Sequence, residues 1–169
     1  IQKAARQFKP EVIIHAAAYT QVDQAESDQK TCRKVNQIGT QNIVKAAKKI
    51  AAKLAYISTD YVFDGKKNSP YSETDKPHPL SVYGKSKLEG ELAVQEIRGN
   101  YVIIRTAWLF GPFRKNFVTA ILELGRKNRS VSVVTDQHGS PTYTADLSDA
   151  IRTAISKDLR GIYHVTNSG

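Results

Sequence analysis

Short apolar runs alternate along the chain with longer stretches in which apolar residues recur at helical spacing. The runs predict buried strands over residues 11–18, 54–58, 101–106, 131–135 and 161–166. The spacing predicts helices over residues 28–50, 83–97, 116–127 and 145–156, and residues 1–8 read as the tail of another helix. In the helix over 28–50, the residues expected on or near one apolar face are Val35, Ile38, Ile43, Ala46 and Ala47.

The predicted strands are near-continuous apolar runs rather than alternating ones, and they alternate with helices. This pattern is typical of a mostly parallel sheet that is covered by helices on both faces. The sequence therefore predicts a doubly wound α/β fold of the Rossmann type. Ligands of such folds bind at the carboxyl ends of the strands, which here are residues 18–20, 58–61 and 106–108.

Candidate chemistry lies in Tyr83-Gly84-Lys85-Ser86-Lys87, which follows Thr59 by 24 residues. A tyrosine and a lysine four residues apart on a helix share one face, so the ammonium can lower the pKa of the phenol. The phenol could then exchange a proton with a substrate oxygen that the Thr59 hydroxyl holds. Ser81 stands where it could cap this helix. Together these residues indicate an oxidoreductase site.

Composition narrows the function classes. The chain has 169 residues, 40% of them apolar, and a net charge of +9, but its Lys and Arg are scattered over the predicted helices. Neither a nucleic-acid-binding module nor an apolar run long enough to span a membrane is present, so we expect no nucleic acid and no membrane as partners. A single Cys32 suits a reducing compartment, and a cytoplasmic location is expected.

Metal binding is not expected from the sequence. His15 ends an apolar run and is better explained by a buried hydrogen bond than by a metal, and the other histidines are dispersed. The acidic residues Asp23, Glu26 and Asp28 read as the charged start of a helix. The glycine-rich turn that holds a dinucleotide pyrophosphate is also absent, so we expect the first strand-helix unit of the fold to be missing from this segment.

The motifs resemble those of a known family. They are His15-Ala-Ala-Ala-Tyr-Thr-Gln-Val-Asp23, Ser58-Thr-Asp-Tyr-Val-Phe63, Val82-Tyr-Gly-Lys-Ser-Lys87, Arg105-Thr-Ala-Trp108, Asp136-Gln-His-Gly-Ser-Pro-Thr142 and Gly161-Ile-Tyr-His164. This set is similar to the extended short-chain dehydrogenase/reductases and, within them, to the dTDP-4-dehydrorhamnose reductases. The resemblance implies that residues 1–169 form a partial NAD(P)-binding Rossmann-type domain that lacks most of a C-terminal substrate lobe. Segments of about 112–145 would be inserted on the substrate side.

The resemblance also implies roles for single residues. Thr59, Tyr83 and Lys87 would be catalytic, with Tyr83 as proton donor in the reduction of the C4 ketone of dTDP-4-dehydro-L-rhamnose by NADPH or NADH. The residues implied to bind the cofactor are Ala18, Tyr19, Thr20, Tyr83 and Lys87. The residues implied to bind the nucleotide sugar are Thr59, Asp60, Trp108 and Asn116. Asn36 resembles an asparagine that supports the active-site lysine through water, and a homodimer is possible.

Other functions remain open at this point. A dehydratase of the same superfamily would carry Glu where Tyr61 follows Asp60, which counts against dehydration. An epimerase typically shows a Ser-rich segment at this point, which is absent here, and another nucleotide-sugar reductase of the superfamily is the remaining enzyme alternative. The last is a non-catalytic dinucleotide-binding subunit that resembles the regulatory β subunit of methionine adenosyltransferase. Turnover of NAD(P)H with a dTDP-4-keto-sugar separates the enzyme from the binding subunit.

Overall fold

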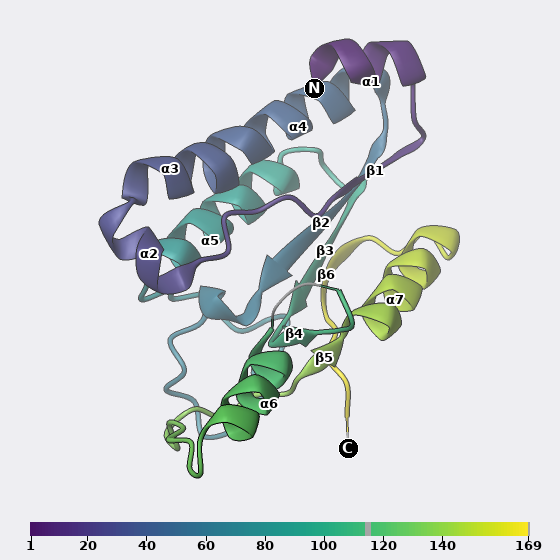
Figure 1. Cartoon of the computed structure of the whole chain (residues 1–169). Helices are drawn as coiled ribbons and strands as arrows, with labels where there is room; N and C mark the ends of the chain where they lie inside the picture. The colour runs from purple at the N-terminus through teal and green to yellow at the C-terminus, as the bar shows by residue number, and fades with distance from the viewer. Residues whose placement is uncertain (114–115, 169) are drawn as a thin grey trace.

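Four parallel strands form the central sheet of the computed structural model, which describes residues 1–113 and 116–168 (Figure 1). They are β1 (Val12–His15), β2 (Lys53–Thr59), β3 (Tyr101–Thr106) and β6 (Gly161–His164). Their order in the sheet is β1-β2-β3-β6, and every neighbouring pair is parallel. The prediction of a parallel sheet is confirmed.

Helices cover both faces of this sheet. Helices α4 (Thr40–Ile50) and α5 (Val82–Gln95) lie on one face, and α7 (Thr144–Ser156) lies on the other (Figure 1). Successive side chains of a strand point to opposite faces. Leu54 of β2 therefore packs with α4 and α5, whereas Ala55 packs with α7. Two cores on opposite faces of one sheet make the fold doubly wound, as the sequence predicts.

The predicted helix over 28–50 is one continuous helical run with a wider turn in its middle. It consists of α3 (Gln29–Arg33), the π-helix η1 (Lys34–Gly39) and α4. Its buried residues are Cys32, Asn36, Thr40, Val44, Ala46 and Ala47. Ala46 and Ala47 are buried, as expected for the predicted apolar face, whereas Val35 and Ile38 of that face are 36% and 48% exposed.

Short elements that the pattern did not predict complete the chain. They are α2 (Val22–Ser27), the 3₁₀ turn η2 (Asp60–Val62), and the two single-ladder strands β4 (Leu109–Phe110) and β5 (Thr142–Tyr143). The predicted tail of a first helix is α1 (Gln2–Phe8). None of the helices described in the structure is long and apolar enough to cross a membrane.

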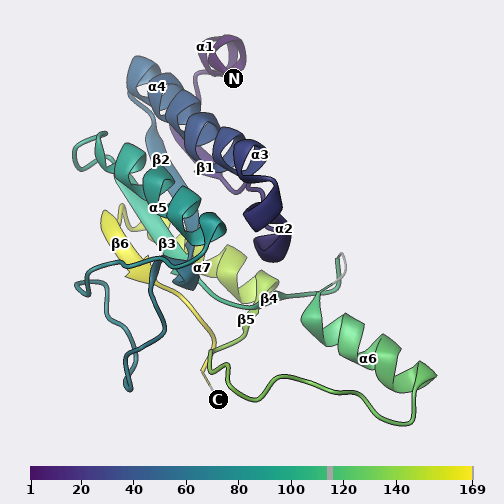
Figure 2. The same ribbon diagram turned by 90° about the vertical axis from the view of Figure 1, so that its left-hand side faces the viewer.

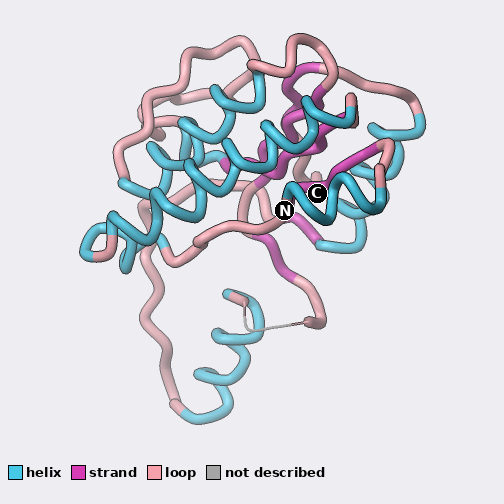
Figure 3. The backbone as a smooth tube through the Cα atoms, turned by 90° about the horizontal axis from the view of Figure 1, so that it is seen from above, coloured by secondary structure: helices cyan, strands magenta, loops and turns pink. Residues whose placement is uncertain are grey.

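Residues 111–113 and 116–141, here called the excursion, lie outside the body of the fold. The excursion starts after β4 and ends before β5, and these two strands pair with each other. Its helix α6 (Phe117–Lys127) stands apart from the sheet in Figures 2 and 3. The predicted strand over 131–135 is wrong, because no strand of the described chain lies beside it to accept its hydrogen bonds.

Candidate active site

The candidate catalytic residues come together where β2 meets the first turns of α5. Thr59 ends β2 and is paired in register with Thr106 at the end of β3. Tyr83 and Lys87 lie one turn apart at the start of α5, after the N-cap Ser81, whose side chain accepts a hydrogen bond from the Gly84 amide. Tyr83 is 8% exposed, Lys87 2% and Thr59 6%, so all three are held inside the protein.

Gly84 explains how the two elements approach each other. A Cβ at this position would collide with the backbone carbonyl of Tyr61 in η2 and would lie 3.1 Å from the Pro79 Cβ. Only glycine lets the chain after Thr59 pack this closely against the helix. On the opposite side of the helix, Ser86 bonds with Cys32 (3.3 Å) and Asn36 (3.0 Å), which fixes the helix to the π-helical turn.

Burial dominates the electrostatics of Tyr83. It raises the pKa of this phenol to about 12, and an interaction with the Thr59 hydroxyl acts in the opposite direction. The Tyr61 ring meets the Tyr83 ring edge-on, with 5.6 Å between the centroids. The predicted tuning of Tyr83 by the Lys87 ammonium stays a prediction. The phenol is protonated at neutral pH and is suited to donate its proton.

Lys87 is a buried cation with two contacts on β2. Its Nζ donates a hydrogen bond to the Ile57 carbonyl (2.7 Å) and lies 4.1 Å from the centroid of the Tyr56 ring. Burial lowers the pKa of Lys87 to about 7, and the charge of Glu91 opposes this shift.

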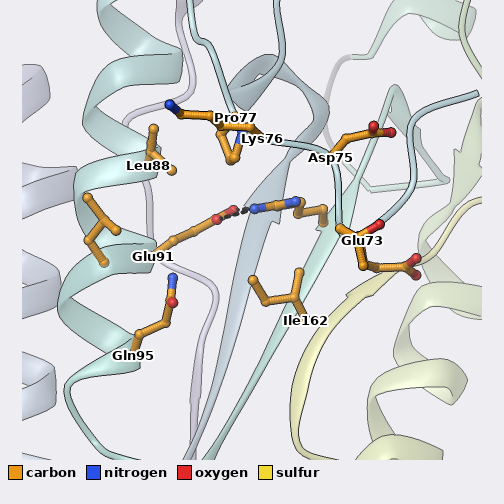
Figure 4. A pocket seen from close by; sticks show the side chains of 11 residues that line it. Glu73, Asp75, Lys76, Pro77, Leu88, Glu91, Gln95 and Ile162 are labelled. Atoms are coloured by element: carbon orange, nitrogen blue, oxygen red, sulfur yellow. Dashed lines mark hydrogen bonds and ion pairs between the residues drawn. The ribbon is translucent and has the colours of Figure 1, made fainter.

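Glu91, one turn beyond Lys87, belongs to a buried ion pair that sequence reasoning missed. It accepts two hydrogen bonds from Arg105, at 2.9 and 2.7 Å, and one from the Ser58 hydroxyl at 2.5 Å. Both residues of the pair line a groove of about 460 Å³ that residues 73–77 also line, and Figure 4 labels Glu91 there. Glu91 could have been found from the sequence, because it follows Lys87 by four residues and therefore lies on the same face of the helix. The pair ties β2, β3 and α5 together behind the site.

The loop after β1 is fixed by Asn36. Its Oδ1 accepts a hydrogen bond from the Tyr19 amide (2.8 Å), and its Nδ2 donates one to the Tyr19 carbonyl (3.0 Å). Tyr19 also packs beside Tyr83 and Cys32. Ala18 and Thr20 flank this fixed residue at the same edge of the sheet as Thr59. Among the described residues, Asn36 hydrogen-bonds to Ser86 rather than to Lys87, so its predicted support of the lysine through water stays a prediction.

The residues predicted to bind substrate occupy three different environments. Asp60 is half-buried and accepts a hydrogen bond from Thr59 (3.0 Å); burial raises the pKa of its carboxyl group. Trp108 is 41% exposed and has a left-handed backbone (φ 44°). Asn116 caps α6, accepting from the Thr119 amide (3.1 Å) and donating to the Gly111 carbonyl (2.8 Å). The structure therefore gives Asn116 a structural function, and its contact with substrate stays a prediction.

Trp108 is the point where the excursion meets the body. A Cβ added at Gly139 would lie 3.0 Å from two atoms of the Trp108 ring, so the glycine lets residues of the predicted 136–142 motif lie against it. The Thr142 amide also donates a hydrogen bond to the Trp108 carbonyl (3.2 Å). Among the described residues, no three His, Cys, Asp or Glu side chains are grouped closely enough to hold a metal ion.

Comparison with known proteins places this arrangement in a family. Residues 1–169 match the family described as "RmlD substrate binding domain". The chain belongs to the RmlD substrate-binding domain family. The dTDP-4-dehydrorhamnose reductase of Sinorhizobium fredii is 43% identical over 176 residues, which cover 100% of this chain and 60% of that relative.

Two solved structures of dTDP-4-dehydrorhamnose reductases have this fold. The crystal structure of dTDP-4-dehydrorhamnose reductase from Bacillus anthracis in complex with NADP matches with a TM-score of 0.96 and 46% identity, covering 99% of this chain and 60% of that one. A dTDP-4-dehydrorhamnose reductase from Clostridium acetobutylicum matches with a TM-score of 0.96 and 42% identity, covering 99% and 60%. The chain thus spans about 60% of the length of these relatives.

Proposed function

We propose that this chain forms the catalytic part of an NAD(P)H-dependent reductase that converts dTDP-4-dehydro-L-rhamnose to dTDP-L-rhamnose. The observation that carries the proposal is the buried group of Thr59, Tyr83 and Lys87 at the carboxyl edge of the sheet. The family and the names of the similar reductases support it.

The strand end beside Lys87 suits a dinucleotide. The small side chains of Ala16 and Ala17 lie exposed after β1, and Asn36 fixes the backbone of the next residues. In the proposal, Ala18, Tyr19 and Thr20 line the cofactor, and the Lys87 ammonium binds the nicotinamide ribose. When bound, the reduced nicotinamide supplies the hydride for the reaction.

Thr59 and Tyr83 act on the oxygen of the substrate ketone. Negative charge develops on this oxygen during reduction, and the Thr59 hydroxyl, which donates to Asp60 in the structure, turns its proton to this oxygen and stabilises it by a hydrogen bond. Tyr83 donates its proton to the same oxygen and gives the alcohol. A pKa of about 12 keeps the phenol protonated until the oxygen becomes more basic than the phenolate. Asp60 and Trp108 bind the sugar beside it, and Asn116 lies on the nucleotide side.

The experiment is a turnover assay on the purified full-length protein. Consumption of NADPH and of NADH is followed by absorbance with dTDP-4-dehydro-L-rhamnose as substrate. Tyr83→Phe removes only the transferable proton, so kcat should fall by roughly 10²- to 10⁴-fold while cofactor affinity is retained. Tyr101→Phe, at the amino end of β3, is the matched control and should turn over normally.

Two outcomes would decide against the proposal. A protein that binds NADPH but turns over no dTDP-4-keto-sugar would favour the non-catalytic binding subunit. A Tyr83→Phe enzyme with the kcat of the wild type would show that another group donates the proton. We further propose that the full-length protein forms a homodimer, which sedimentation of the purified protein tests. We also propose a cytoplasmic location, which fractionation of cells that express the protein tests.

A further inference from the structure

Tyr56 lies directly behind the candidate catalytic lysine. It is fully buried on β2, on the face of the sheet that α4 and α5 cover. The Lys87 Nζ lies 4.1 Å from the centroid of its ring, and the same Nζ hydrogen-bonds to the carbonyl of the next residue, Ile57. A cation over an aromatic face at this distance is attracted by the negative potential of the ring, most strongly where water is excluded.

We propose that Tyr56 is a positioning residue for Lys87, because its ring face and the Ile57 carbonyl together hold the ammonium charged and aimed at the ribose of the dinucleotide. This inference rests on the proposed function, in which Lys87 binds that ribose. The ring contributes its face, whereas its buried hydroxyl forms no hydrogen bond of good geometry among the described residues and has the Thr40 side chain as a polar neighbour. The proposal therefore predicts that the ring is essential and that the hydroxyl is dispensable.

Two neighbours fix the plane of the Tyr56 ring. The His15 ring packs against it at a centroid distance of 5.3 Å and an angle of 53°, and His15 is itself hydrogen-bonded to Thr40 (3.0 Å). On α5, a Cβ at Gly90 would collide with the Tyr56 hydroxyl. Gly90 thus leaves the space that lets the ring lie under Lys87, three residues earlier on the same helix.

Glu91 on α5 and His15 on β1 interact electrostatically with Lys87. Other titratable groups lie on α5 and on the elements packed against it and enter any pH measurement on this lysine: Tyr83 on α5, Asp60 on η2, Cys32 on α3, Glu26 on α2 and Arg105 on β3. Arg105 is paired with Glu91, and burial together with the charge of Lys87 lowers the pKa of His15 to about 4, so this histidine is neutral above that pH. Burial also lowers the pKa of Lys87 to about 7. The ring and Glu91 both favour the charged form against this burial.

The test measures the affinity of the full-length protein for NADPH across pH by fluorescence titration. Binding should weaken as the pH rises through the pKa of Lys87. Tyr56→Met keeps an apolar side chain but removes the ring face, so its alkaline midpoint should move down by roughly half to one and a half pH units. Tyr56→Phe keeps the face of the aromatic ring and should show the same alkaline midpoint as the wild type. Tyr163→Met, on the other face of the sheet, is the control for loss of a tyrosine ring.

Gly90→Ala is a second variant that should disturb the contact between Lys87 and the ring while keeping the Tyr56 side chain. Its methyl group displaces the ring, so it should shift the midpoint as Tyr56→Met does, and Tyr56→Phe in the same chain should reverse the shift. Folded Tyr56→Met or Gly90→Ala proteins with the wild-type midpoint would overturn the inference. A wild-type protein that neither binds nor oxidises NADPH would instead overturn the proposed function on which it rests.

Discussion

The body of the sheet and the excursion carry similar apolar patterns but pack differently. In the body, Leu54 and Ile103 are completely buried between strands and helices. In the excursion, Phe117 and Leu122 are 64% and 56% exposed, and α6 contains no buried residue. Helical spacing predicted a helix correctly in both regions, at α5 in the body and at α6 in the excursion. Periodicity therefore specifies which helix forms, whereas burial depends on a partner that must lie beside it.

The largest difference between the two regions is expected when a positive charge is removed from each of them and the free energy of unfolding is measured. Arg105→Met leaves the fully buried Glu91 without its partner, so the free energy of unfolding should fall by about 3–5 kcal/mol. Arg126→Met, on the exposed surface of α6, should change it little. Urea denaturation of the full-length variants measures both. Equal effects would show that the two regions are equally buried in the whole protein.

Two histidines, His15 in the body and His138 in the excursion, should differ in their effect on the pH dependence of stability. Burial lowers the pKa of His15 to about 4, whereas the unfolded chain binds this proton near pH 6.5. Stability from His15 is therefore complete above about pH 6.5 and is lost as the pH falls toward 4, by up to about 3 kcal/mol.

The measurement compares unfolding free energies between pH 4 and 7. His15→Asn should flatten the pH dependence, while His138→Asn, in the exposed excursion, should leave it in place. A His15→Asn slope equal to that of the wild type would contradict the assignment of a buried, neutral His15.

Two helical glycines give a third comparison. Gly84→Ala forces a methyl group into the Tyr61 carbonyl, so it should cost about 1–3 kcal/mol and lower turnover, since it separates Thr59 from Tyr83. Gly125→Ala in α6 meets no atom within 4 Å and should stabilise the protein by about 0.5–1 kcal/mol. Thermal unfolding and the reductase assay check both variants. Stabilisation by Gly84→Ala would refute the close approach of η2 to α5.

The smallest effect is expected where the two regions meet. Gly139→Ala brings a methyl group to 3.0 Å from the Trp108 ring, which must shift by a few tenths of an ångström. If Trp108 binds the sugar, KM for the nucleotide sugar should rise several-fold while thermal stability and kcat stay near those of the wild type. A rise in the KM for NADPH alone would place Trp108 on the cofactor side instead.

The sequence predicted the body well because most strands and helices there have the partners that their patterns require. The exception is the edge strand β1, which was predicted to be buried but leaves Ile14 53% exposed. Thr59, Tyr83 and Lys87 could be grouped because strand ends converge and residues four apart share a helix face. Glu91 and Arg105 were missed because charged residues in regular elements are usually solvated, and only the fold reveals a partner across 14 residues.

Other differences have equally local causes. Val35 and Ile38 were placed on or near the apolar face by a uniform helical period, which η1 interrupts. The strand over 131–135 was predicted from β-branched composition, but a strand needs a neighbour for its backbone hydrogen bonds. Sequence periodicity carries no information about either event.

The short ladder between β4 and β5 has a consequence for how this protein can vary. Two residue pairs, Leu109 with Thr142 and Phe110 with Tyr143, close the excursion at its base. Once the base is closed, a change in the length of the intervening chain costs little entropy, about 0.6 kcal/mol for each doubling. Changes in the length of the chain between α6 and the 136–142 motif can therefore be accommodated without altering the strand register on which Thr59 depends. The ladder thus uncouples the length of this segment from the geometry of the candidate catalytic edge.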